Sequence, residues 1–262
     1  MFQDFKIITV LFLSIFIISS CVGVDFKVRE LSYDQIKESQ KYIRSTNLDD
    51  VAPKTEEELL ALFIKVTNRI SLWSKKFCEQ YADKTDSCEW DIQLVRNTSF
   101  NAYASDQNNI VVFSGLVNSL ETESELAFVI AHEISHHIAD HLNESFKNNA
   151  LGRVTAASLG FIIFGNDVNI DQVSEIGGQL ANFRFSRDQE NEADLFALSI
   201  IYHAGYDLDE AKLALLRIAK LKDKVGKRSS FFDTHPSNPE RIAYFDLHRD
   251  IIEASEELSI VN

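Results

Sequence analysis

The feature that most constrains this chain is a short motif with two histidines, His132-Glu133-Ile134-Ser135-His136. Histidines four residues apart lie on the same face of an α-helix, so both can bind one metal ion if this segment is helical. The intervening glutamate can then act on a metal-bound water. We expect the helix to cover residues 124–142, because apolar side chains recur on the opposite side: Ala127, Ala131, Ile134, Ile138 and Leu142. The motif is therefore expected to face a cleft rather than the core.

A second histidine pair, His137 and His141, has the same spacing. On a continuous helix these side chains point about 100 to 180° away from His132, so the two pairs cannot share one ion. His137 also lacks a preceding glutamate at the required offset. We assign His137 and His141 to packing or to surface hydrogen bonds.

A catalytic zinc site has three protein ligands and a water, so a third ligand must come from elsewhere in the chain. Ser186 followed by Gln189 has the pattern of a capping box and predicts that a helix begins there. Glu190 and Asp194 then share one face of that helix, so Glu190 can reach the metal while Asp194 hydrogen-bonds a ligand histidine. Glu192 points elsewhere. The alternative is an ordinary solvated, acidic helix start.

The rest of the chain predicts a mostly helical α+β fold with a small β-sheet next to the helix that carries the motif. An acidic turn after Pro53, followed by apolar residues at helical spacing, predicts one long helix. Alternating or β-rich runs at 90–95, 101–104 and 109–113 predict strands. Further helices are expected at 150–165, 186–204, 208–222 and 239–257. Without an evident repeat or linker, residues 53–262 are expected to form one domain.

The N-terminus has the shape of a signal peptide, with an apolar run from Ile7 to Ile18 and small residues before Cys21. The run is shorter than the roughly 20 residues that span a bilayer, which makes a permanent anchor the poorer interpretation. Residues 18–21 resemble the bacterial lipobox, which implies removal of residues 1–20 and lipidation of Cys21. Since Val22 follows the cysteine, the pattern resembles that of Gram-negative lipoproteins on the periplasmic face of the outer membrane. An ordinary secretory signal is the alternative, and residues 21–52 would be a spacer with a short helix near 33–43.

Export would place the other two cysteines, Cys78 and Cys88, in an oxidising compartment, where such a pair most simply forms a disulfide. Two free thiols or a metal pair are the alternatives, although no CxxC motif or nearby histidine supports a metal site. The formal net charge is -14, from 26 Lys and Arg against 40 Asp and Glu. Nucleic acid is therefore not an expected partner.

Several motifs in order resemble the HtpX-like and CAAX prenyl protease-like zinc metallopeptidases, and within them the periplasmic BepA-like branch. The resembling segments lie between about residues 55 and 250: Asn101-Ala-Tyr-Ala, Asn109 to Leu116, Glu123 to His136, Ser186-Arg187, Glu190 to Asp194, Ala204 to Asp207, Thr234-His235-Pro236 and Arg241. The resemblance implies one Zn²⁺ held by His132, His136 and Glu190, with Glu133 as general base and Asp194 behind a ligand histidine. It also implies that His235 either steadies the oxyanion or occupies the water position in a closed form. Arg241 is expected to position the segment of His235 through a salt bridge.

The expected activity is that of a zinc-dependent endopeptidase acting on misfolded or unassembled envelope proteins near the membrane surface. The strand 109–113, with Asn101 and Ala102 beside it, is a candidate edge to which an extended substrate adds, placing Asn109 and Val111 in contact with the substrate. A plain structural strand is the alternative for this edge. The alternative function is a lipoprotein chaperone or assembly factor whose zinc site is latent or closed. The oligomeric state is not predicted.

Overall fold

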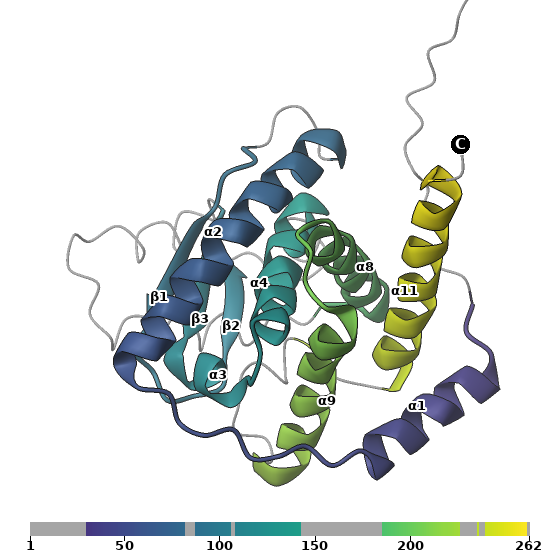
Figure 1. Ribbon diagram of the computed structural model, residues 1–262, viewed down its shortest axis with the longest axis horizontal. Coiled ribbons are helices and arrows are strands. Elements are labelled where there is room, and N and C mark those ends of the chain that lie inside the picture. Colours follow the sequence, from purple (N-terminus) through teal and green to yellow (C-terminus); the bar gives the residue numbers. More distant parts are fainter. Residues whose placement is uncertain are drawn as a thin grey trace, which may run out of the picture.

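The computed structural model describes residues 30–81, 87–105, 108–142, 185–225, 235 and 239–260. Over these ranges the fold is α+β, with a small sheet on one side of a group of helices (Figure 1). The elements are α1 (Tyr33–Ser45), α2 (Glu56–Tyr81), β1 (Asp91–Val95), β2 (Ala102–Ser105), β3 (Asn109–Phe113), α3 (Ser114–Ser119), α4 (Glu123–Ile138), α8 (Arg187–His203), α9 (Leu208–Val225) and α11 (Pro239–Ile260). The predicted signal peptide, the lipidation of Cys21 and the helix at 150–165 lie outside the described residues.

The helices begin where local sequence signals place them. The predicted capping box at Ser186 is confirmed, because its hydroxyl accepts a hydrogen bond from the Gln189 backbone N–H and the Gln189 side chain accepts one from the Ser186 N–H. Thr122 starts α4 with the same reciprocal pair. The acidic first turn of α2 and the helices expected at 186–204, 208–222 and 239–257 are also confirmed. These starts are local features, which explains why the sequence alone predicts them.

The sheet has the strand order β1-β3-β2, with β1 parallel and β2 antiparallel to β3. Asp91 is paired with Asn109 and Ala102 with Val112, so β3 has a neighbour on both sides. The expectation that strand 109–113 is a free edge is therefore wrong. Its hydrogen-bonding groups are used within the sheet, and an added strand cannot pair with it.

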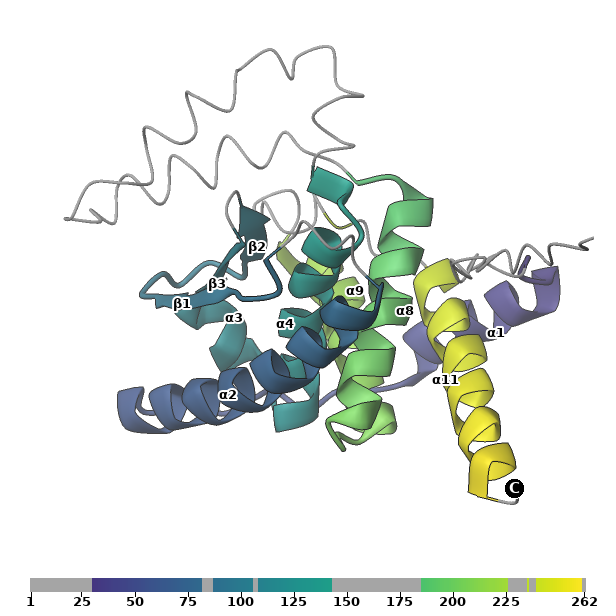
Figure 2. The same ribbon diagram turned by 90° about the horizontal axis from the view of Figure 1, so that it is seen from above.

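Helix α4 lies at the centre of the fold, between the sheet and α8, where α2 and α9 also pack against it (Figures 1 and 2). Every residue from Ser124 to His136 is buried, so α4 has no solvent-facing stripe. The expected cleft face is therefore corrected: the motif residues are inside the fold. The helix also ends earlier than expected, at Ile138, because Asp140 adopts a left-handed backbone conformation with φ 56°.

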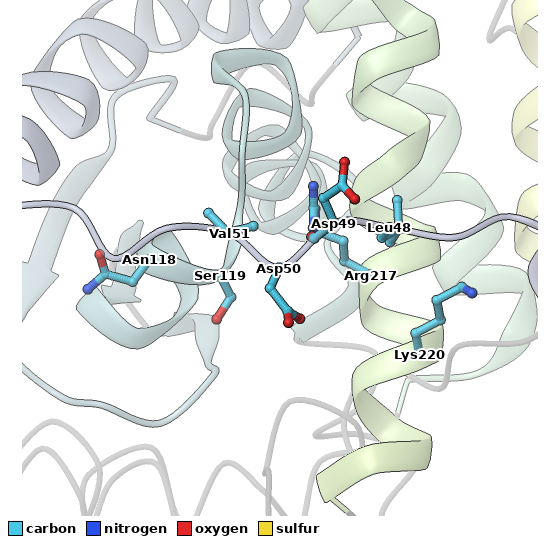
Figure 3. A pocket seen from close by; sticks show the side chains of 8 residues that line it. All are labelled: Leu48, Asp49, Asp50, Val51, Asn118, Ser119, Arg217 and Lys220. Carbon is cyan, nitrogen blue, oxygen red and sulfur yellow. Dashed lines mark hydrogen bonds between the residues drawn. The ribbon is translucent and has the colours of Figure 1, made fainter.

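Residues 46–54 form an extended strap between α1 and α2 that crosses α9 and α3. The strap is held by cations: Lys54 Nζ donates to the Leu120 carbonyl at 2.6 Å, and Arg217 Nη1 donates to the Asp49 carbonyl at 3.2 Å. A cavity of about 210 Å³ lies at this crossing (Figure 3), lined by Leu48, Asp49, Asp50, Val51, Asn118, Ser119, Arg217 and Lys220. Arg217 is also bonded to Glu125 at 2.6 Å, and Lys220 donates to the Thr46 carbonyl, so both cations at this cavity attach the strap to α9.

Two covalent or steric constraints fix the sheet to the helices. The predicted disulfide between Cys78 and Cys88 is present, with a Cα–Cα distance of 5.6 Å, and ties the end of α2 to the segment before β1. At the start of α3, the Gly115 N–H donates to the Asn97 carbonyl at 2.8 Å, and a Cβ there would lie 2.2 Å from the Thr98 carbonyl oxygen. Over the described ranges, none of the helices combines the length and apolarity needed to span a bilayer.

Candidate metal centre

Four buried side chains from three separate parts of the chain converge beside α4. His132 and His136 come from α4, Glu190 from the first turn of α8, and His235 precedes α11. One ligand atom from each lies within 4.8 Å of the others. Nε2 of His132 is 3.1 Å from Nε2 of His136 and 3.2 Å from Nδ1 of His235. The structure thus brings together the three predicted ligands and adds His235 to them.

The spacing of these atoms fits a tetrahedral ion. For metal–ligand bonds of 2.0–2.1 Å, the edge of a coordination tetrahedron is about 3.3 Å. Oε2 of Glu190 lies 3.5 Å from Nε2 of His132, and Oε1 lies 3.5 Å from Nε2 of His136 and 2.9 Å from Nδ1 of His235. Three imidazoles and one carboxylate meet in this cluster, and these are donor groups typical of Zn²⁺. The residues therefore fit a divalent metal, with zinc as the expected ion.

The charge balance supports the same conclusion. Among the described residues, three buried carboxylates lie in or beside the cluster, Glu133, Glu190 and Asp194, and Arg241 is the one guanidinium that contacts them. With neutral histidines, two negative charges are left without compensation by the residues that the structure describes, and burying such charges is costly. A divalent cation at the cluster would neutralise them.

Arg241 is held by two acidic residues of α8, Glu190 and Asp194. Its Nε and Nη2 donate to the two oxygens of Asp194 at 2.7 Å, and Nη1 lies 2.8 Å from Oε2 of Glu190. Asp194 in turn lies 2.8 Å from Nδ1 of His132. Arg241 therefore contacts the metal-site carboxylates themselves. Its expected role of positioning the segment of His235 stays a prediction.

The ionisation of these groups follows from burial and from their neighbours. Burial lowers the pKa of His136 well below its ordinary value, which keeps the ring neutral as metal binding requires. Burial would raise the pKa of Glu190, but His235 and Arg241 outweigh it and hold that pKa well below the usual range. For His235, burial lowers the pKa while Glu133 and Glu190 raise it by more. This is the response of an imidazole to excess negative charge.

Glu133 is positioned by the sheet. Its Oε2 accepts a hydrogen bond from the Ala104 backbone N–H of β2 at 3.0 Å. The other oxygen, Oε1, is buried, lies 3.4 Å from Nε2 of His235 and makes no hydrogen bond within the described part of the chain. A buried carboxylate oxygen beside a metal cluster is suited to accept a proton from a water bound there.

Two residues that the sequence did not assign to the site contact His136, and a third, Glu192, contacts one of them. Phe185 stacks on its ring, with centroids 3.8 Å apart. His141 Nδ1 lies 3.0 Å from His136 Nδ1, and His141 Nε2 lies 3.2 Å from Glu192. The assignment of His141 to packing or the surface missed this contact because it assumed a continuous helix; no glycine or proline marks the break at Asp140.

The predicted substrate-contacting residues lie on different strands of the sheet. Asn109 and Val111 belong to the central strand β3, whereas Ala102 belongs to β2, which has β3 as its only strand neighbour in the described sheet. The Phe113 N–H donates to the Asn101 carbonyl, so by antiparallel alternation Ala102 and Ala104 direct their backbone groups away from β3. The bond from Ala104 to Glu133 agrees with this. The side of β2 that has no strand neighbour in the described sheet thus faces Glu133.

Comparison with known proteins gives a family. Residues 68–247 match the family model described as Peptidase family M48. Metalloprotease LoiP of Escherichia coli (strain K12) is 34% identical over 145 residues, covering 54% of this chain and 55% of LoiP. Mitochondrial metalloendopeptidase OMA1 of Arabidopsis thaliana is 31% identical over 157 residues, covering 60% and 31%. The beta-barrel assembly-enhancing protease of Escherichia coli (strain K12) is 28% identical over 157 residues, covering 57% and 32%. The matches thus span between 31% and 55% of the length of these relatives.

Proposed function

This chain belongs to peptidase family M48, and on that premise we propose that it is a zinc-dependent endopeptidase that hydrolyses peptide bonds in misfolded or unassembled envelope proteins. The observation that carries the proposal is the buried Oε1 of Glu133 beside the cluster of His132, His136 and Glu190. A structural zinc site has no use for such a base.

We assign the following roles to the residues of the site. His132, His136 and Glu190 would hold the ion, which when bound lowers the pKa of a water and polarises the substrate carbonyl. Glu133 would take the proton of the attacking water at Oε1 and return it to the leaving amine. Asp194 would keep His132 oriented through Nδ1, and Arg241 would hold Asp194 and Glu190 in place.

We assign substrate binding to β2. The backbone groups of Ala102 and the carbonyl of Ala104 are directed away from β3 and could pair with an extended peptide, a mode of recognition with little sequence selectivity, whereas the Ala104 N–H is bonded to Glu133. Both residues are buried in this structure, at 0% and 5% exposure, so a substrate would have to displace what covers them. An unfolded or unassembled protein offers the extended segment that this mode requires.

An envelope location is part of the proposal. It is supported by the resemblance of residues 1–20 to a signal peptide followed by Cys21, by the disulfide, and by the named role of the beta-barrel assembly-enhancing relatives. Lipidation of Cys21 would tether the enzyme to the periplasmic face of the outer membrane, with unfolded envelope proteins as its partners. Mass spectrometry of the purified native protein tests this, because lipidation requires loss of residues 1–20 and an acylated Cys21.

Glu133→Gln tests the proposed chemistry. We expect the purified wild-type protein to cleave casein and the variant to lose about 10²- to 10⁴-fold in rate, which is the contribution of a positioned general base. Zinc content should be equal in both, because Glu133 is not a ligand. Glu123→Gln is the matched control, since it removes an exposed carboxylate from the same helix. Equal cleavage by wild type and Glu133→Gln would refute the assigned role.

The second candidate is the chaperone or assembly factor with a closed zinc site, and one observation favours a closed state. His235 is 1% exposed and its Nδ1 lies within the ligand cluster, where a catalytic site keeps a position for water. If His235 closes the site of an enzyme, His235→Ala should speed casein cleavage. Absence of cleavage by both proteins, despite one zinc per chain, would support the binding protein.

A further inference from the structure

His136 is contacted from behind by a histidine that is not part of the metal cluster. Nε2 of His136 faces His132 and Glu190, while Nδ1 of His136 lies 3.0 Å from Nδ1 of His141. His141 is 1% exposed, so this contact is shielded from water. The second nitrogen of His141, Nε2, lies 3.2 Å from Oε2 of Glu192, whose side chain is 42% exposed. These three residues form a continuous row from the cluster to the surface.

The row has one consistent assignment of hydrogens. If His136 binds a metal through Nε2, its Nδ1 carries a proton and must donate. His141 must then accept at Nδ1 and carry its own proton on Nε2. That N–H points at the carboxylate of Glu192, which only accepts. Each nitrogen is thereby satisfied, and the assignment leaves Nε2 of His136 free for the ion.

The other ligand histidine, His132, contacts a carboxylate of α8 directly. Nδ1 of His132 lies 2.8 Å from Asp194, a carboxylate on α8. Glu192 lies on the same helix, two residues before Asp194, and reaches His136 only through His141. Phe185 stacks on His136 and fixes the plane of its ring, but an apolar ring cannot select which nitrogen is protonated.

We propose that His141 and Glu192 are positioning residues that hold His136 in the orientation and tautomer required for metal binding. The inference rests on the proposed function, because it takes the cluster to be a zinc site. Hydrogen-bonding partners behind a ligand histidine typically contribute about 10- to 100-fold to metal affinity. His141 therefore acts through His136 and does not itself touch the ion.

The first test compares His141→Phe with His137→Phe in the full chain. Both changes replace an imidazole with a phenyl ring, but His137 contacts only the Asn109 carbonyl, at 3.5 Å, among the described contacts. Zinc affinity is measured by competition with a chelator, and the absorption spectrum of the Co²⁺-loaded protein reports ligand geometry. We expect His141→Phe to bind zinc about 10- to 100-fold more weakly, with an altered Co²⁺ spectrum. His137→Phe should match wild type in both.

The second test uses partial restoration. His141→Asn supplies a carbonyl acceptor near the place of Nδ1 but cannot reach Glu192, so its zinc affinity should lie between those of wild type and His141→Phe. Glu192→Ala should weaken zinc binding as well, and should add nothing further in a His141→Phe background, because the effect passes through His141. Asp188→Asn, which removes another acidic charge from α8, is its control.

The outcomes separate the two levels of inference. Wild-type protein that binds no zinc would overturn the proposed function. Wild-type protein that binds zinc, with His141→Phe and Glu192→Ala within about twofold of it, would overturn the positioning role alone. If His141→Phe fails to fold, as judged by circular dichroism, the His141→Asn and Glu192→Ala measurements decide, and unchanged affinity in both refutes the proposal.

Discussion

Replacement of Arg241 by methionine tests whether the buried charges of the site are balanced as the structure indicates. Methionine keeps a long apolar stem but removes the guanidinium, which lies within 2.7–2.8 Å of Asp194 and Glu190. Arg241 is 3% exposed and both carboxylates are 1% exposed, so solvent cannot take its place. Removing one partner of a buried ion pair costs about 3–5 kcal/mol. We expect that loss in the free energy of unfolding of the zinc-free protein.

The effect should be smaller with zinc bound. The ion then shares the charge of Glu190, so that mainly Asp194 loses its partner. For a domain of this size, 1 kcal/mol shifts Tm by about 2–4 °C, so the zinc-free variant should melt about 6–20 °C lower. Because Arg241 lowers the pKa of Asp194 against the effect of burial, this stabilisation is complete at pH 7 and is lost only as pH falls below about 4.

Urea unfolding and calorimetry at pH 7, with and without zinc, measure the stability that Arg241→Met loses. Arg187→Met is the control, because the ion pair of Arg187 with Glu240 is exposed and such pairs contribute about 1 kcal/mol or less. If Arg241→Met in the zinc-free protein loses no more than the control, or loses more with zinc than without, the charge argument fails.

Three further predictions concern the scaffold. Burial lowers the pKa of His137 to about 4, so wild type should lose up to about 3 kcal/mol more stability between pH 6.5 and pH 4 than His137→Gln; equal pH profiles in urea unfolding would contradict this. Gly115→Ala should destabilise the protein by more than 2 kcal/mol or so, because the new Cβ would meet backbone at 2.2 Å, and an unchanged Tm would refute the steric argument. Reduction of Cys78–Cys88 should lower stability by about 2–4 kcal/mol, measured with dithiothreitol, while a Cys78→Ala/Cys88→Ala protein should be insensitive to the reductant.

The sequence alone predicted those features that depend on local physics. An i, i+4 spacing puts His132 and His136 on one helix face, and the capping pattern at Ser186 fixes where α8 begins and therefore which of its acids point together. The short strands and the Cys78–Cys88 pair were also readable, because alternation and cysteine spacing require no knowledge of distant residues. These features were sufficient to bring His132, His136 and Glu190 into one candidate site.

Only the tertiary structure decided the rest. β3 is the central strand because β1 pairs with it in parallel, and no local sequence pattern predicts that pairing. As a result, the strand edge beside the metal cluster belongs to β2. Asp140 adopts a left-handed backbone conformation, which turns His141 back onto His136. An aspartate in the sequence is not sufficient to predict this conformation. The contacts of Arg241 and His235 with Glu190 cross about fifty residues of sequence. Burial of the whole cluster follows from packing on every side of α4, and packing is a property of the assembled elements rather than of any one of them.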